Sequence, residues 1–171
     1  IGATNNKPTA AFINRNGRFE EQKLPGLTEI KPFTESDLSI ADFDNDGDND
    51  VVVLAGGYEN QDENEFRHYL YRNNNGVFKA ELLPLPAFSA SVVRICDIDH
   101  DGDMDLFIGS RIKKGMYPYA TSSWILRNDN GVFRADPASG LNLGMVTDAV
   151  WSDYDNDGWE DLFVTRDWNS I

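Results

Sequence analysis

The chain repeats one acidic pattern three times, as DFDNDGDND at residues 42–50, DIDHDGDMD at 97–105 and DYDNDGWED at 153–161. All three fit D-x-D-x-D-G-x-x-D. A hard divalent cation such as calcium takes about six to eight oxygen ligands at roughly 2.3–2.6 Å, so a short loop supplies them only by curling around the ion. The glycine at the sixth position permits that sharp turn. The spacing therefore predicts three loops that each hold a calcium ion.

In each loop the side-chain oxygens are expected from the first, third, fifth and ninth positions, and a backbone carbonyl from the seventh. The predicted side-chain ligands are Asp42, Asp44, Asp46 and Asp50, then Asp97, Asp99, Asp101 and Asp105, then Asp153, Asp155, Asp157 and Asp161, and the carbonyls are those of Asp48, Asp103 and Trp159. Metal-free turns also favour Asp and Gly. Four carboxylates in one short loop, however, repel one another unless a cation lies among them, which favours Ca²⁺, about three ions per chain.

The residues after each loop separate it from an EF-hand, which ends in a bidentate Glu at the twelfth position and runs into a helix. Here the twelfth residues are Val53, Ile108 and Val164, which have no ligand atoms in their side chains. The runs VVVLAG, LFIGS and LFVTR that follow the loops are short, apolar and rich in β-branched residues, which is typical of buried strands. Each loop is therefore predicted to join two strands.

A second motif accompanies the loops: INRNGRF at residues 13–19, RNNNGVF at 72–78 and RNDNGVF at 127–133. Asn-Gly between apolar runs predicts a β-hairpin with a type I′ turn, because both central residues of that turn need positive φ. In the two complete cases, 36 residues separate the first loop Asp from the hairpin Phe. This constant spacing indicates one repeated structural unit.

Each unit is predicted to contain four antiparallel strands. The first strands are expected at 38–43, 93–98 and 149–154, the second after each acidic loop, the third at 9–14, 68–73 and 123–128, and the fourth from Phe19, Phe78 and Phe133. Four-stranded antiparallel units that repeat at roughly 40–60 residues are typical of β-propeller blades. The predicted fold class is therefore all-β, a β-propeller segment.

The repeats divide residues 1–171 into a half blade at 1–24, blades at 38–83 and 92–135, and a half blade at 149–168. These amount to about three blade equivalents, whereas propellers have about four to eight blades. We therefore expect the chain to be part of a larger propeller. Self-association of several chains to complete a ring is the alternative.

The combination of these motifs resembles the FG-GAP/VCBS repeat family of calcium-binding β-propellers, which includes the integrin α-subunit head and many secreted bacterial proteins. The likeness covers nearly the whole chain. It implies that each calcium loop joins the first and second strands of a blade, with ligands at the Asp positions named above. The FG and GAP ends of the family motif are weak here, with Gly56, Gly57 and Gly109 as remnants.

The composition narrows the class of partner and the location. A formal net charge of −14 over 171 residues argues against binding nucleic acid or anionic membrane surfaces. No run approaches the roughly 18 apolar residues that a membrane span needs. Cys96 is the single cysteine and directly precedes the first Asp of the second loop, near the end of a predicted strand, where a small packed residue is expected. The chain begins with Ile and shows no signal peptide, as an excised segment would, and loops of modest calcium affinity favour an extracellular or periplasmic location.

The connections opposite the acidic loops are the predicted ligand-binding face, because long loops on a rigid scaffold commonly carry function. One of them, residues 110–121, gathers cations and aromatic residues in an otherwise acidic chain: Arg111, Lys113, Lys114, Met116, Tyr117 and Tyr119. Such residues are frequent in binding hot spots, although a loop with solvated lysines is the plainer interpretation. Residues 57–67 are expected to form a solvated acidic loop, or a salt-bridging partner of the basic one.

Evidence for catalysis is thin. His68 begins a predicted strand and His100 occupies a non-ligand position of its loop, and neither has a Ser or Cys partner in the sequence. The leading hypothesis is a module for extracellular protein or carbohydrate recognition or cell adhesion, with structural calcium and no enzymatic activity of its own. The alternative is part of a secreted polysaccharide-degrading enzyme whose catalytic residues lie outside this segment.

Overall fold

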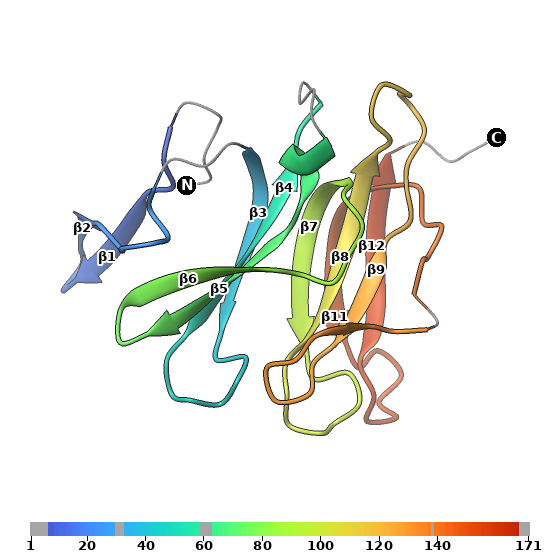
Figure 1. Ribbon diagram of the computed structural model, residues 1–171. Coiled ribbons are helices and arrows are strands. Elements are labelled where there is room, and N and C mark those ends of the chain that lie inside the picture. Colours follow the sequence, from blue (N-terminus) through green and yellow to red (C-terminus); the bar gives the residue numbers. More distant parts are fainter. Residues whose placement is uncertain (1–6, 30–32, 59–62, 138, 168–171) are drawn as a thin grey trace.

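Four antiparallel sheets follow one another along the chain in the computed structural model, which describes residues 7–29, 33–58, 63–137 and 139–167 (Figure 1). Their strand orders are β1-β2, β3-β4-β5-β6, β7-β8-β9-β10 and β11-β12. The all-β prediction is confirmed. The first six residues of the predicted half blade at 1–24, residue 168 of the one at 149–168, and residues 30–32, 59–62 and 138 of the predicted loops lie outside the described residues.

The elements have the following bounds. The strands are β1 (Ala11–Arg15), β2 (Arg18–Gln22), β3 (Thr34–Ala41), β4 (Asp50–Gly56), β5 (Tyr69–Asn74), β6 (Val77–Leu82), β7 (Ser89–Cys96), β8 (Asp105–Ile112), β9 (Trp124–Arg127), β10 (Arg134–Ala135), β11 (Met145–Ser152) and β12 (Asp161–Asp167), and a short 3₁₀ helix, η1, spans Glu63–Phe66. Within the described residues, no helix has the length and apolarity to cross a membrane.

The predicted bounds of the first strands are wrong in the same way three times. β3, β7 and β11 each begin four residues earlier than expected and end two residues earlier. They begin earlier because a β-bulge near each start, such as that between Glu35 and Asp37, keeps the strand paired along the whole of its neighbour. They end earlier because the first loop Asp already belongs to the turn. β8 likewise runs to Ile112, so residues 110–112 are strand and not loop.

The core lies between the sheets, and β4 illustrates how it is built. Successive side chains of a strand point to opposite faces, so Val52 and Leu54 pack toward β8 while Val51 and Val53 pack toward Leu27 and its neighbours. β4 is therefore buried along its whole length. Among the strands that the structure describes, β12 pairs with β11 alone, and the side chain of Phe163 on β12 is 43% exposed.

The three Asn-Gly turns have the predicted conformation. The φ angles are 54°, 51° and 49° at Asn16, Asn75 and Asn130, and 86° to 87° at the glycines that follow. In each hairpin, the side-chain oxygen of the Asn two positions before the turn Asn accepts the N–H of the turn glycine at 2.8–2.9 Å. This bond explains the first Asn of the N-x-N-G motif.

Asn128 has a second role between sheets. Its side chain is buried, and its amide nitrogen donates to the backbone carbonyl of Phe43, the second residue of the first acidic loop, at 2.8 Å. The Phe43 ring also packs edge-on against Phe133, with centroids 5.4 Å apart. One hairpin thus fixes the acidic loop of the preceding sheet.

Asn128→Ala should destabilise the protein by about 1–3 kcal/mol, because the Phe43 carbonyl and the Gly131 N–H would both lose a partner in the interior. Asn14→Ala is the matched control, since Asn14 makes the same turn bond in an exposed hairpin where water can replace it. Urea unfolding of both variants measures the difference. Equal losses would contradict the role of Asn128 between the sheets.

Candidate metal centre

The three acidic loops lie together at one end of the sheets, while the β4–β5 and β8–β9 connections lie at the other (Figure 1). Each loop is built by its first Asp. The carboxylate of Asp42 accepts the N–H of Asp46 at 3.2 Å and of Gly47 at 2.9 Å, and Asp97 and Asp153 make the equivalent bonds. These bonds from backbone N–H groups four and five residues further on fold the chain back on itself, so the turn is encoded locally.

The fourth position of each loop also has a conformational requirement. Asn45, His100 and Asn156 adopt φ of 58° to 60°, in the left-handed region, ahead of the glycine at the sixth position. Asn and His are among the non-glycine residues enriched there. The sequence analysis identified this position only as one that does not ligate.

Three carboxylates in each loop bring an oxygen within 4.8 Å of one another. The three groups are Asp42, Asp44 and Asp46, then Asp97, Asp99 and Asp105, then Asp153, Asp155 and Asp157. The remaining predicted side-chain ligands, Asp50, Asp101 and Asp161, lie in the same loops but outside these groups. The structure therefore places three of the four predicted side chains of each loop around one point.

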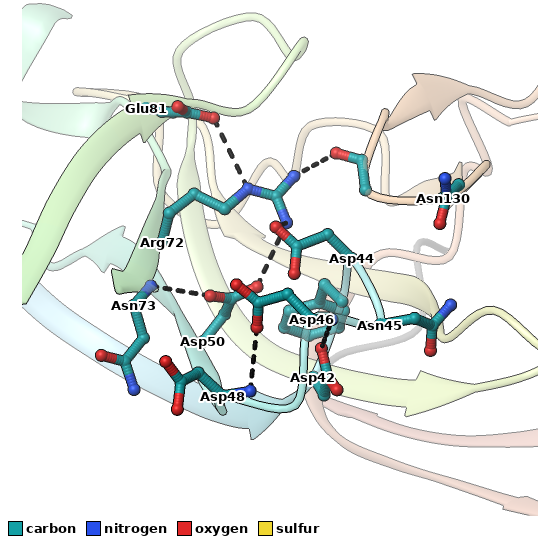
Figure 2. Close-up of polar contacts among 12 residues, drawn as sticks. Asp42, Asp44, Asn45, Asp46, Asp48, Asp50, Arg72, Asn73, Glu81 and Asn130 are labelled. Atoms are coloured by element: carbon teal, nitrogen blue, oxygen red, sulfur yellow. Dashed lines mark hydrogen bonds and ion pairs between the residues drawn. The ribbon is translucent and has the colours of Figure 1, made fainter. Parts of the chain in front are cut away.

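One buried atom fits a cation. Oδ1 of Asp44 is shielded from solvent, and no hydrogen-bond donor of the described residues reaches it. Figure 2 shows this carboxylate beside those of Asp42, Asp46 and Asp50. A buried carboxylate oxygen without a donor is costly. A hard cation is the kind of partner that this oxygen lacks.

In the first two loops the ninth Asp is the most buried carboxylate, whereas Asp161 of the third loop is exposed. Asp50 and Asp105 are each 0% exposed. Asp50 accepts the backbone N–H of Asn73 at 2.8 Å, and Asp105 that of Asn128 at 2.7 Å. Burial raises the pKa of both carboxyl groups, and these bonds, together with the neighbouring arginines, act in the opposite direction.

An arginine lies against the third and ninth carboxylates of the first two loops. Nη1 of Arg72 is 3.2 Å from Asp44 and 3.1 Å from Asp50, and Nη1 of Arg127 is 3.4 Å from Asp99 and 3.0 Å from Asp105. Arg72 also donates to the backbone carbonyl of Gly131, in the hairpin of the next sheet (Figure 2). The signal for these residues was present in the sequence, since each arginine precedes the first Asn of a hairpin motif, but the analysis gave it no role.

The seventh residue fastens the loop to its own hairpin. Oδ2 of Asp48 accepts the backbone N–H of Asn75 at 2.8 Å, and Oδ2 of Asp103 accepts that of Asn130 at 2.6 Å. The predicted ligand of these residues is the carbonyl, so the side chain has a separate function. Trp159 has the seventh position of the third loop, and its ring stacks on His100 with centroids 4.5 Å apart.

Neighbouring loops are linked through the fourth position. Nδ2 of Asn45 donates to Asp103 at 2.7 Å, and Nε2 of His100 lies 3.0 Å from Glu160. The hydrogen bond to Glu160 is the main cause that raises the pKa of His100. The three loops therefore form one connected row.

Two residues considered for chemistry have structural positions instead. His68 is buried, and its Nδ1 accepts the backbone N–H of Ala55 at 3.2 Å, while burial lowers its pKa to about 3. In the next sheet the hydroxyl oxygen of Ser123 accepts the backbone N–H of Ser110 in the same way, at 3.0 Å. Burial raises the pKa of the Cys96 thiol to about 11, which keeps it protonated and unreactive at neutral pH.

Comparison with known proteins identifies the repeated unit. Residues 42–108, from the first Asp of the first loop into β8, match the family of FG-GAP-like repeats. The chain carries an FG-GAP-like repeat. The predicted resemblance is thereby confirmed for residues 42–108, which contain the first two acidic loops and the strands between them.

This chain is also similar to an animal protein. Integrin alpha-3 of Cricetulus griseus is 28% identical over an alignment of 157 residues, and the match covers 84% of this chain and 15% of that protein. The chain thus spans about 15% of the length of this relative.

Arg72→Met in the FG-GAP-like repeat should cost about 3–5 kcal/mol in the presence of a chelator, because it leaves the Asp50 carboxylate buried without an opposite charge. The matched control is Arg15→Met, which removes an exposed pair with Glu20 at 3.3 Å and should cost about 0–1 kcal/mol. Urea unfolding with chelator gives both values. A small and equal cost for the two variants would show that Arg72 does not neutralise Asp50.

Proposed function

We propose that this chain is a calcium-stabilised segment of a β-propeller that serves as an extracellular recognition module for a protein or carbohydrate ligand. The two-stranded sheets β1–β2 and β11–β12 are its half blades, and the four-stranded sheets β3–β6 and β7–β10 are its whole blades. The observation that carries the proposal is the gathering of three carboxylates in every acidic loop, together with the buried Asp44 oxygen that has no donor among the described residues.

The arrangement of the sheets supports a propeller. The last three sheets pack against one another in chain order, and their first strands β3, β7 and β11 are neighbours across the sheets. Arg94 on β7 joins these strands, since it contacts Asp37 at 3.0 Å and also pairs with Asp148. Sheets that succeed one another around a line of first strands are the architecture of propeller blades. The FG-GAP-like repeat points the same way.

The metal is proposed to act on stability and not on chemistry. In each loop one ion would be held by the four predicted Asp side chains, which makes twelve in the three loops. The backbone carbonyl of Asp48, Asp103 or Trp159 would complete each set. A bound calcium ion supplies a double positive charge that offsets the repulsion among the carboxylates of one loop. The loops then hold together the strand pairs that they join, β3–β4, β7–β8 and β11–β12, and keep them in place against the neighbouring loop.

The extracellular location is part of the proposal. Calcium loops of modest affinity fill only where free calcium is well above cytosolic levels. The similarity to an integrin alpha chain supports the same location and a role in recognition. The chain spans a small share of that relative. The proposed recognition therefore concerns the surfaces of this segment and not the whole relative.

Removal of calcium should lower the melting temperature of the chain by several degrees or more. A ligand that binds only the folded state stabilises it by mass action, so its loss is seen directly in the melt. Calorimetric scans in excess calcium and in excess chelator, at constant ionic strength, measure the shift. Identical melting curves would exclude a structural calcium ion.

Asp99→Ala should destabilise the chain in calcium and have little effect in chelator, because Asp99 is proposed to act through the metal. The matched control is Asp129→Ala, which removes an exposed carboxylate outside the loops that pairs with Arg134 at 3.0 Å. This control should be small in both conditions. If Asp99→Ala costs the same with and without calcium, its role is packing or the contact with Arg127.

A further inference from the structure

A cavity of about 620 Å³ is lined by residues of β3, β7, β8 and β11. The ends of these strands that line it lie opposite the acidic loops (Figure 1). The cavity volume is within the roughly 300–1,000 Å³ of small-molecule sites. The floor is apolar, since Ala90, Ile112 and Met145 are all buried there. The predicted ligand surface is at the same end, but most of its basic residues are absent from the lining of the cavity.

Two tyrosines from different connections stand at the rim. Tyr58 follows β4 and is 62% exposed, and Tyr117 lies between β8 and β9 and is 57% exposed. A tyrosine ring offers an apolar face together with a polar edge. Exposed rings of this kind in the lining of a cavity suit a ligand that has apolar faces of its own.

Three serines in the lining donate their hydroxyl protons to backbone carbonyls of the protein. Ser36 donates to the carbonyl of Leu54 at 3.4 Å, Ser89 to that of Gly57 at 2.9 Å and Ser91 to that of Gly109 at 3.2 Å. A serine oxygen that has donated its proton still has two acceptor lone pairs. Ser36 and Ser91, which are not buried, therefore present acceptors that suit the hydroxyl donors of a ligand, whereas Ser89 is only 3% exposed.

The lining has no uncompensated charge among its described residues. Arg111 is the charged residue there, and its guanidinium donates to Asp167 at 2.6 Å. An anionic ligand would have to compete with that carboxylate, in a chain whose formal charge is −14. A neutral ligand meets no such cost.

We propose that this cavity binds a neutral saccharide, with a pyranose ring against Tyr58 or Tyr117 and sugar hydroxyls donating to the two serines that are not buried. A sugar ring combines apolar C–H faces with many hydroxyl donors, which matches the rings, the acceptors and the absence of free charge. The inference deepens the proposed recognition function by naming the class of ligand. Its site is remote from the acidic loops, so it fails or succeeds independently of calcium.

The test titrates the full chain, in calcium, with four neutral disaccharides: maltose, cellobiose, lactose and N,N′-diacetylchitobiose. Glucuronic acid and the amide of N-acetylphenylalanine are the anionic and peptide-like probes. Chemical-shift changes in NMR spectra measure binding up to millimolar concentrations, and a melting curve of each sample reports the calcium-dependent fold separately. We expect saturable binding of at least one disaccharide.

Three variants connect any binding to the cavity. Tyr117→Ala should weaken the best disaccharide at least about fivefold, while Tyr117→Phe, which keeps the ring, should stay near the wild-type affinity. Tyr119→Ala is the matched control, because Tyr119 is 64% exposed on the same connection but does not line the cavity. Absence of saturation with all four disaccharides, tighter binding of glucuronic acid or the phenylalanine amide, or unchanged affinity in Tyr117→Ala would each overturn the proposal.

Discussion

Mutual repulsion of carboxylates held in one short loop is the constraint on which the structure depends. Each nine-residue loop places three carboxylate oxygens within 4.8 Å of one another, and the charge must be offset for the loop to keep this shape. In the first two loops, part of the compensation is internal, because Arg72 and Arg127 lie against the third and ninth carboxylates. The remaining charge, including that of the buried Asp44 oxygen, is what we assign to a cation.

The aspartates of a loop share one residue type but divide the work. In the first loop Asp42 forms the turn, Asp48 fastens the loop to its hairpin and the buried Asp50 binds the backbone of β5, and the second loop repeats this division. Each loop also contacts its neighbour, through Asn45 or His100. We therefore expect a change in one loop to alter the contacts of the next. The repeat is thus a structural module whose acidic loop joins strands within a sheet and sheets within the row.

Local rules explain what the sequence predicted. Asn-Gly turns and D-x-D-x-D-G loops are set by backbone conformation and short-range hydrogen bonds, so both were located correctly. The starts of β3, β7 and β11 depend on bulges and on pairing with distant residues, which no local pattern contains. For the same reason, the contact of Arg72 with Gly131 and the cavity beside Tyr58 became visible only in three dimensions. The bound metal itself remains a prediction.

The number of calcium ions that the folded chain binds tests this account most directly. Isothermal titration of the calcium-free chain, with equilibrium dialysis as an independent count, gives the stoichiometry without assuming a role for any residue. The account predicts three ions per chain, one for each group of carboxylates. A folded chain that binds none would contradict it, because the acidic loops would then keep their shape without a cation.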